Sequence, residues 1–180
     1  MNKSTKHAVS SGGMPWRTLG WGGAAVLLAL PLVAMQFTEE VRWYETDFIV
    51  LGLLIGAAGG LLELALRLSR SPAYRAGFAA AVLGAFLLIW ANLAVGIVGN
   101  EDNPFNLWFF ALLAVGPLGA LIAHGRASGM APTMGIMAAA QTVLFLFAQA
   151  THAGEGWPAL FFLPFWLAGA ALFSRASREG

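Results

Sequence analysis

The chain has 180 residues, of which 58% are hydrophobic and only 11% are charged, and its mean hydropathy is +0.71. Soluble domains carry about 25% charged residues, so this composition excludes an ordinary soluble enzyme, and the high apolar content excludes a disordered chain. The absence of cysteine excludes disulfides, thiolate metal sites and covalent c-type haem. The composition therefore predicts a protein embedded in a membrane.

Six charge-poor stretches are long enough to cross a bilayer, which takes about 20 apolar residues per helix. In chain order they lie between Arg17 and Glu39, from Phe48 to Leu68, between Arg75 and Glu101, from Asn103 to Arg126, between Arg126 and Glu155, and between Glu155 and Arg175. Because backbone groups in lipid must pair within their own segment, these stretches predict helices. We therefore expect an all-α integral membrane bundle of six transmembrane helices, with proline kinks at Pro31, Pro117 and Pro164.

The domain organisation follows from these spans. We expect a flexible cytoplasmic tail over residues 1–15, one six-helix transmembrane domain over residues 16–175, and a cytoplasmic tail over residues 176–180. A cleaved signal peptide is the alternative for the N-terminus, since basic residues precede an apolar run there. The length of that run and the lack of a small-x-small cleavage site favour an uncleaved first helix.

The charges of the connecting loops alternate in sign along the chain. Nine of the ten basic residues fall on one side of a six-span topology, and only Arg42 falls on the other. Lysine and arginine near span ends stay in the cytoplasm, so both termini are expected inside. Trp43, Trp108 and Trp157 then lie near the outer interface, where aromatic belts form.

The second span carries a stripe of glycines, Gly52, Gly56 and Gly60, with Glu63 and Arg67 on the same helical face. Glycine at this spacing lets another helix approach closely. A carboxylate inside the membrane is a candidate functional residue, and Arg67, one turn further on, is its expected partner. Glu63 lies near the cytoplasmic end, where snorkelling and a packing role are favoured over function.

The third span places small and polar residues on one further face, which predicts interhelical packing with a hydrogen bond from Asn92. These residues are Ala81, Ala85, Asn92, Gly96 and Gly99. In the fifth span the polar seam consists of Gln141, Gln149 and His152, and interhelical hydrogen bonding is again favoured over a polar path.

Acidic residues gather on the expected outer side, among them Asp47, Glu101 and Asp102, the last two next to Asn103. The turn GNEDNP, residues 99–104, is rich in side chains that bond their own backbone. Oxygen ligands of this kind suit Ca²⁺ or Mg²⁺, but no EF-hand spacing is present, so a solvated acidic rim is favoured over a metal site.

No catalytic arrangement is apparent in the sequence. Its three histidines lie on the N-terminal tail, an inner helix end and an outer helix end, so they cannot bind one metal or haem together. Phosphate loops and nucleophile elbows are absent, and the few basic residues are explained by orientation rather than by nucleic-acid binding. We therefore expect no enzyme, no cofactor and no nucleic-acid partner.

Three segments resemble a family of small, uncharacterised multi-pass membrane proteins of bacteria. They are FTEEVRWYETDF (residues 37–48), WANLAVGIVGNEDNPFNLWFF (residues 90–110) and LAVGPLGALIA (residues 113–123). The resemblance implies a multi-pass protein of the bacterial inner membrane with a bundle of four to six helices, and it leaves the first helix optional. It implies no activity.

Three functions fit these features. The leading hypothesis is a non-enzymatic accessory or assembly component that packs its helices in the lipid bilayer against a membrane-protein partner or a second copy. The alternative is a small-solute or ion transporter or channel that uses Glu63 and the polar seam. A third is a sensor of a cation or another ligand at the GNEDNP turn.

Overall fold

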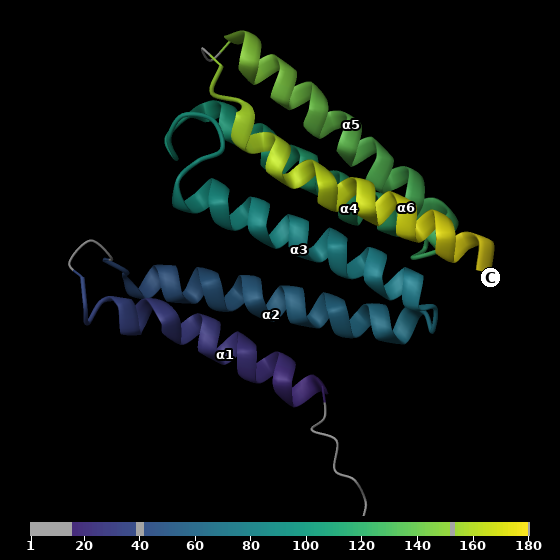
Figure 1. The fold of residues 1–180 in the computed structure, drawn as a ribbon, viewed down its shortest axis with the longest axis horizontal. Coiled ribbons are helices and arrows are strands. Elements are labelled where there is room, and N and C mark those ends of the chain that lie inside the picture. Colours follow the sequence, from purple (N-terminus) through teal and green to yellow (C-terminus); the bar gives the residue numbers. More distant parts are fainter. Residues whose placement is uncertain (1–15, 39–41, 152–153, 180) are drawn as a thin grey trace, which may run out of the picture. The chain divides into compact units, whose positions relative to one another are not determined.

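A computed structural model of the protein describes residues 16–38, 42–151 and 154–179, and within them it contains helices and no strand. The expected tail over residues 1–15 and His152 lie outside the described residues. In chain order the elements are α1 (Trp16–Ala34), α2 (Glu45–Leu68), α3 (Pro72–Ala94), η1 (Pro104–Asn106), α4 (Leu107–Ile122), α5 (Ala127–Thr151), η2 (Trp157–Phe162) and α6 (Leu163–Glu179), drawn in Figure 1.

Five helical segments of the described chain are long and apolar enough to cross a membrane. They are α2, α3, η1 with α4, α5, and η2 with α6. The apolar part of α1, Thr18–Ala34, is shorter than these five. The structure therefore agrees with a helical membrane protein that has five candidate spans, and the sixth span is still a prediction from the sequence.

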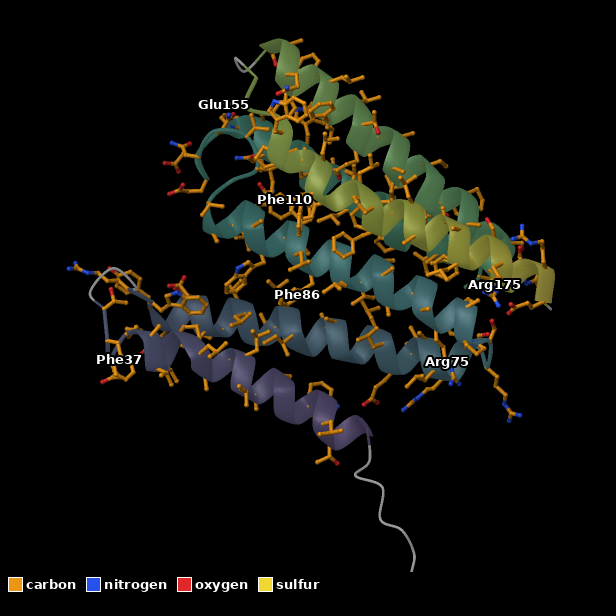
Figure 2. The ribbon with its side chains drawn as sticks, in the orientation of Figure 1. Phe37, Arg75, Phe86, Phe110, Glu155 and Arg175 are labelled. Atoms are coloured by element: carbon orange, nitrogen blue, oxygen red, sulfur yellow. The ribbon has the colours of Figure 1, made fainter. Side chains whose placement is uncertain are left out.

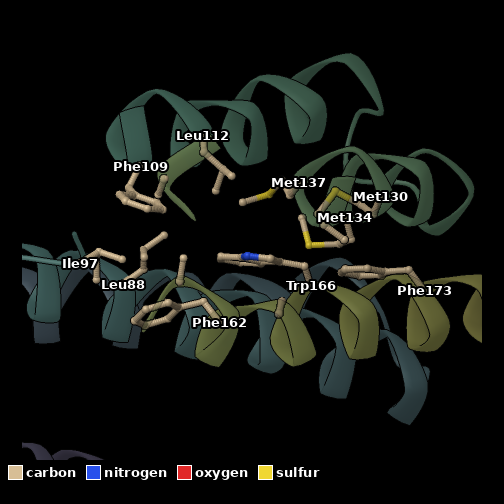
Figure 3. Packing of buried hydrophobic residues seen from close by; sticks show 14 of the residues in the cluster. Leu88, Ile97, Phe109, Leu112, Met130, Met134, Met137, Phe162, Trp166 and Phe173 are labelled. Atoms are coloured by element: carbon tan, nitrogen blue, oxygen red, sulfur yellow. The ribbon is translucent and has the colours of Figure 1, made fainter. Parts of the chain in front are cut away.

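The chain forms two compact units, Met1–Gly52 and Leu53–Gly180. In the second unit α5 packs along α6, α6 along α3, and α4 along α5 (Figure 1). Its core is filled by large side chains, of which Trp166, Phe109 and Phe173 are fully buried, as Figure 3 shows. Most of this core lies among α3 to α6, and Ala65 of α2 also belongs to it.

One end of this second unit is held by hydrogen bonds between distant segments. The Tyr74 hydroxyl donates to the Gly125 carbonyl oxygen at 2.7 Å, and the Ser71 hydroxyl donates to Glu179 Oε2 at 3.1 Å. The start of α3, the turn between α4 and α5, and the end of α6 therefore meet there. Arg75 and Arg175 lie at this end, whereas Glu155 lies at the opposite end (Figure 2).

The turn between α2 and α3 is fixed by side chains of its own sequence. Arg75 Nε donates to the Ser69 carbonyl oxygen at 2.8 Å, and its Nη2 donates to that of Leu66 at 3.2 Å, so a cation satisfies the carbonyl end of α2. Ser71 caps α3 by accepting a hydrogen bond from the Tyr74 N–H, and Pro72 occupies the first helical position.

Helix α6 continues to Glu179, which forms an ion pair of 2.8 Å with Arg175, and the cytoplasmic tail expected over residues 176–180 stays a prediction. One expectation about the last span is wrong. Pro164 was expected inside a helix, but it lies in the first turn of α6, where its missing N–H breaks no intrahelical bond. Pro31 and Pro117 lie inside α1 and α4, as expected.

Candidate functional site

The acidic residue Asp47 has a structural task at the start of α2. Its Oδ2 accepts a hydrogen bond of 2.8 Å from the Tyr44 N–H, directly before the helix. This is one half of a capping box, and the carboxylates of Glu45 and Asp47 in the first turn also favour the positive end of the helix dipole. Helix capping therefore accounts for Asp47.

The expected pairing of Glu63 with Arg67 stays a prediction. Glu63 is half-buried in α2, and Arg67, one turn further on, is exposed. Arg67 stands in the last turn of α2, where its charge favours the negative end of the helix dipole and its long side chain extends into solvent.

The strongest polar cluster in the second unit is built around Asn106, a residue that no sequence pattern indicated. Its buried side chain accepts from the Ile97 and Val98 N–H groups at 3.1 and 3.0 Å through Oδ1. Its Nδ2 donates to the carbonyl oxygens of Val98 and Asn100 at 3.3 and 2.7 Å. A single amide thus satisfies the backbone of a loop that has no secondary structure to do so.

Asn92 and Asn103 extend this cluster. Asn92 Nδ2 donates to the Asn106 carbonyl oxygen at 2.9 Å and so joins α3 to η1. Asn103 caps η1 by accepting from the Phe105 N–H at 3.0 Å, and it donates to the Val98 carbonyl oxygen at 3.1 Å. Asn92 Oδ1 is buried without a hydrogen-bond partner among the described residues. The expected interhelical hydrogen bond from Asn92 is present, although its acceptor is backbone.

Gly96 and Gly99 do not pack helices, contrary to the expectation. Helix α3 ends at Ala94, and both glycines lie in the loop with positive φ angles of 76° and 69°. A Cβ at Gly96 would also lie 2.8 Å from Asn106 Nδ2. These two positions need glycine because the loop turns back in the left-handed region, over the Asn106 side chain.

The acidic residues of the same loop point outward. Glu101 and Asp102 are exposed. A Cβ at Gly99 would lie 3.4 Å from Glu155 Oε2, so the loop between α3 and η1 lies beside the loop between α5 and η2. In the described part of the chain no three His, Cys, Asp or Glu side chains gather in a way that could hold a metal ion. The side chains of Asn103 and Asn106 are used in hydrogen bonds of the loop itself, and the solvated acidic rim stays a prediction.

The polar seam of α5 holds helices together. The fully buried Gln141 donates from Nε2 to the Ala159 carbonyl oxygen at 2.9 Å and accepts from Trp166 Nε1 at 3.2 Å. Gln149 Oε1 accepts from the Gly156 N–H at 2.8 Å. Each glutamine joins α5 to the η2–α6 segment, so the hydrogen bonds fit the packing interpretation rather than a polar path.

The glycine stripe of α2 is open. A Cβ added at Gly52, Gly56 or Gly60 meets no described atom within 4 Å. The glycines at close contacts are others: a Cβ at Gly84 would lie 2.6 Å from Phe165 Cβ, and one at Gly77 would lie 3.2 Å from Leu172 Cβ. Close approach within this chain therefore occurs between α3 and α6, where two glycines seven residues apart are only a weak signal in the sequence. It also occurs between α4 and α5, where Thr133 blocks the Cβ position of Gly119.

An apolar cavity of about 250 Å³ lies within the second unit. Its walls come from α2, α3, α4, α5 and α6, and every lining residue is apolar. Met134, Met137 and Trp166 are buried at its inner wall, where Figure 3 shows the indole beside the methionine side chains. Glu63 does not line this cavity. No sequence pattern indicated it, because it arises from how the helices diverge.

Comparison of the chain with known protein families, curated proteins and solved structures finds no match. Any functional conclusion therefore rests on the geometry described above.

Proposed function

We propose that the chain is a non-enzymatic, multi-pass protein of the bacterial inner membrane that acts as an accessory or assembly component, by packing α2 against a helix of another chain. In this proposal the protein belongs to the bacterial family that it resembles, has six spans, and keeps both termini in the cytoplasm. The five long apolar helices support the membrane location. Arg75 and Arg175 lie at one end of the second unit and Glu155 at the other, which supports the orientation (Figure 2).

The open glycines of α2 carry the proposal. Gly56 and Gly60 are exposed and their Cβ positions are free, whereas Gly84 and Gly77 of α3 are covered by α6. Small residues at four-residue spacing allow two backbones to approach closely in lipid, where packing rather than water drives association. An uncovered stripe of this kind supports the arrival of a helix from outside this unit.

The transporter alternative has less support. The apolar cavity contains no polar or charged lining residue and does not include Glu63. The glutamines of the α5 seam already bond to Ala159, Trp166 and Gly156. A polar solute or ion would need groups that replace its hydration shell, and this cavity offers none.

The mass of the protein purified from its native membrane in mild detergent tests the proposal. We expect a complex heavier than the 19.0 kDa chain, either a homo-oligomer or a partner at fixed stoichiometry. Gly56→Leu or Gly60→Leu should return the chain to its own mass, because a bulky side chain blocks close approach.

Gly135→Leu is the matched control for this experiment. Gly135 is an exposed glycine of α5 whose Cβ position is equally open, so the same substitution should leave the complex intact. A wild-type chain that is monomeric in nanodiscs, or a complex insensitive to Gly56→Leu, would contradict the proposal.

A further inference from the structure

The apolar cavity lies midway along the helices that line it. Its lining residues stand near the middle of their helices, as Ala57 does in Glu45–Leu68, Ala85 in Pro72–Ala94, and Met137 in Ala127–Thr151. The hydrocarbon core of a bilayer is about 30 Å thick, so the middle of a spanning helix lies far from water and headgroups. The molecules that can reach this cavity from the membrane are therefore hydrocarbon chains.

The cavity has a buried inner wall and an accessible rim. Met134 and Met137 are each 2% exposed and Trp166 is fully buried, whereas Leu61 of the rim is 43% exposed. Helix α3 packs along α6 and α4 along α5, but α3 and α4 contact each other only sparsely. This divergence leaves room between α3 and α4 that their own side chains do not fill.

The size and chemistry of the cavity suit one linear chain. It exceeds the apolar cavity of about 150 Å³ that takes up benzene in an engineered protein, and it lies below the range of about 300–1,000 Å³ of sites for larger ligands. An empty apolar cavity forfeits dispersion contacts along its whole lining. Methionines at the inner wall adapt to irregular hydrocarbon shapes because their side chains are flexible and polarizable.

We propose that this cavity binds one acyl chain of a bilayer phospholipid, with the terminal part of the chain against Met134, Met137 and Trp166. The headgroup stays at the interface, since the lining provides no polar partner for it. The site is separate from the part of the glycine stripe around Gly56: at about 100° per residue, Leu54, Ala57 and Leu61 face the cavity, and Gly56 lies on roughly the opposite side of α2. Lipid binding and association through α2 can therefore be tested independently.

Photolabelling in vesicles of defined composition tests this site. The full chain is reconstituted in dioleoylphosphatidylcholine and dioleoylphosphatidylglycerol, with a trace of phosphatidylcholine that carries a diazirine at the end of one acyl chain. After illumination, mass spectrometry of peptides should find adducts on the inner wall, at Met134, Met137 or Trp166. Ala85→Leu and Gly116→Leu fill the cavity from α3 and α4, and in each we expect these adducts to be lost.

Ala79→Leu is the matched control, because Ala79 is a half-buried alanine of α3 that does not line the cavity. It should keep the inner adducts, and so should Gly56→Leu, which tests association alone. Size-exclusion chromatography shows which of the two cavity-filling variants, Ala85→Leu and Gly116→Leu, is folded. One folded cavity-filling variant is enough for the test. Adducts confined to exposed residues such as Leu83 and Leu121, or inner adducts that survive filling, would overturn the proposal.

Discussion

At the scale of single residues, Asn106 organises the acidic end of the second unit. Its one side chain makes four hydrogen bonds to the backbone of the loop between α3 and η1. The loop has no ladder of its own, and Ile97 and Val98 are buried, so their N–H groups have no access to water. A buried backbone group without a partner costs free energy, which explains why an amide with both donors and acceptors stands at this position.

We predict that Asn106→Ala destabilises the protein strongly. The substitution leaves the Ile97 and Val98 N–H groups buried without an acceptor, at a cost on the order of 3 kcal/mol. Thermal unfolding in detergent should show a clear fall of the apparent Tm. Asp102→Asn, in the same loop but exposed, should leave the Tm unchanged. Equal Tm values for Asn106→Ala and wild type would show that the loop is held by other contacts.

At the scale of helices, glycine has two different meanings in this chain. In α3, Gly77 and Gly84 lie directly under side chains of α6. In α6, a Cβ added at Gly169 would lie 3.1 Å from Met134 Cγ of α5. At Gly52, Gly56 and Gly60 of α2 and at Gly135 of α5 the Cβ position is open. The first group sets distances between helices of the same chain, as does Gly119 of α4, whose Cβ position is blocked by Thr133 of α5.

Adding one methyl group should separate these two kinds of glycine. Gly84→Ala places a Cβ 2.6 Å from Phe165 Cβ, and such overpacking costs about 1–3 kcal/mol, more than the gain in helix propensity of up to about 1 kcal/mol. Gly135→Ala has the gain without the clash. We expect a lower apparent Tm for the first variant and an equal or higher one for the second. A neutral Gly84→Ala would mean that α6 moves aside freely.

The sequence predicts the helices far better than their contacts. The long apolar stretches indicated where α2 to α5 would form, because hydrocarbon forces each segment to satisfy its own backbone. The sequence did not show that Gly56 is open and Gly84 is covered, since the identity of a small residue does not depend on whether another helix packs against it. It pointed to Asn92 and Asn103 but missed Asn106, whose role depends on a loop folding back over it. The apolar cavity depends on how far the helices diverge, and the spacing of apolar residues along the sequence does not indicate that distance.

At the scale of the whole molecule, charge is separated along the helices of the second unit. Arg75, Arg175 and Arg178 lie at one end, and Glu101 and Glu155 at the other. Trp108 and Trp157, which belong to the acidic end, are 60% and 64% exposed, as interfacial tryptophans in a lipid environment would be. Both patterns come from loops and helix ends rather than from the core, so they report how the chain lies in a bilayer and not how it packs.

Cysteine labelling can test this orientation without background, because the chain contains no cysteine. We expect Asp102→Cys to react with a membrane-impermeant maleimide once the outer membrane is opened. Ser177→Cys, at the other end, should react only after the inner membrane is also permeabilised, because the positive-inside rule places its arginine neighbours in the cytoplasm. Ser4→Cys extends the test to α1: if this helix is a sixth span, Ser4→Cys behaves like Ser177→Cys. If Ser4→Cys reacts together with Asp102→Cys, five spans are left. If Ser177→Cys reacts together with Asp102→Cys, the topology itself is contradicted, because three crossings should place the end of α6 and the acidic loop on opposite sides of the membrane.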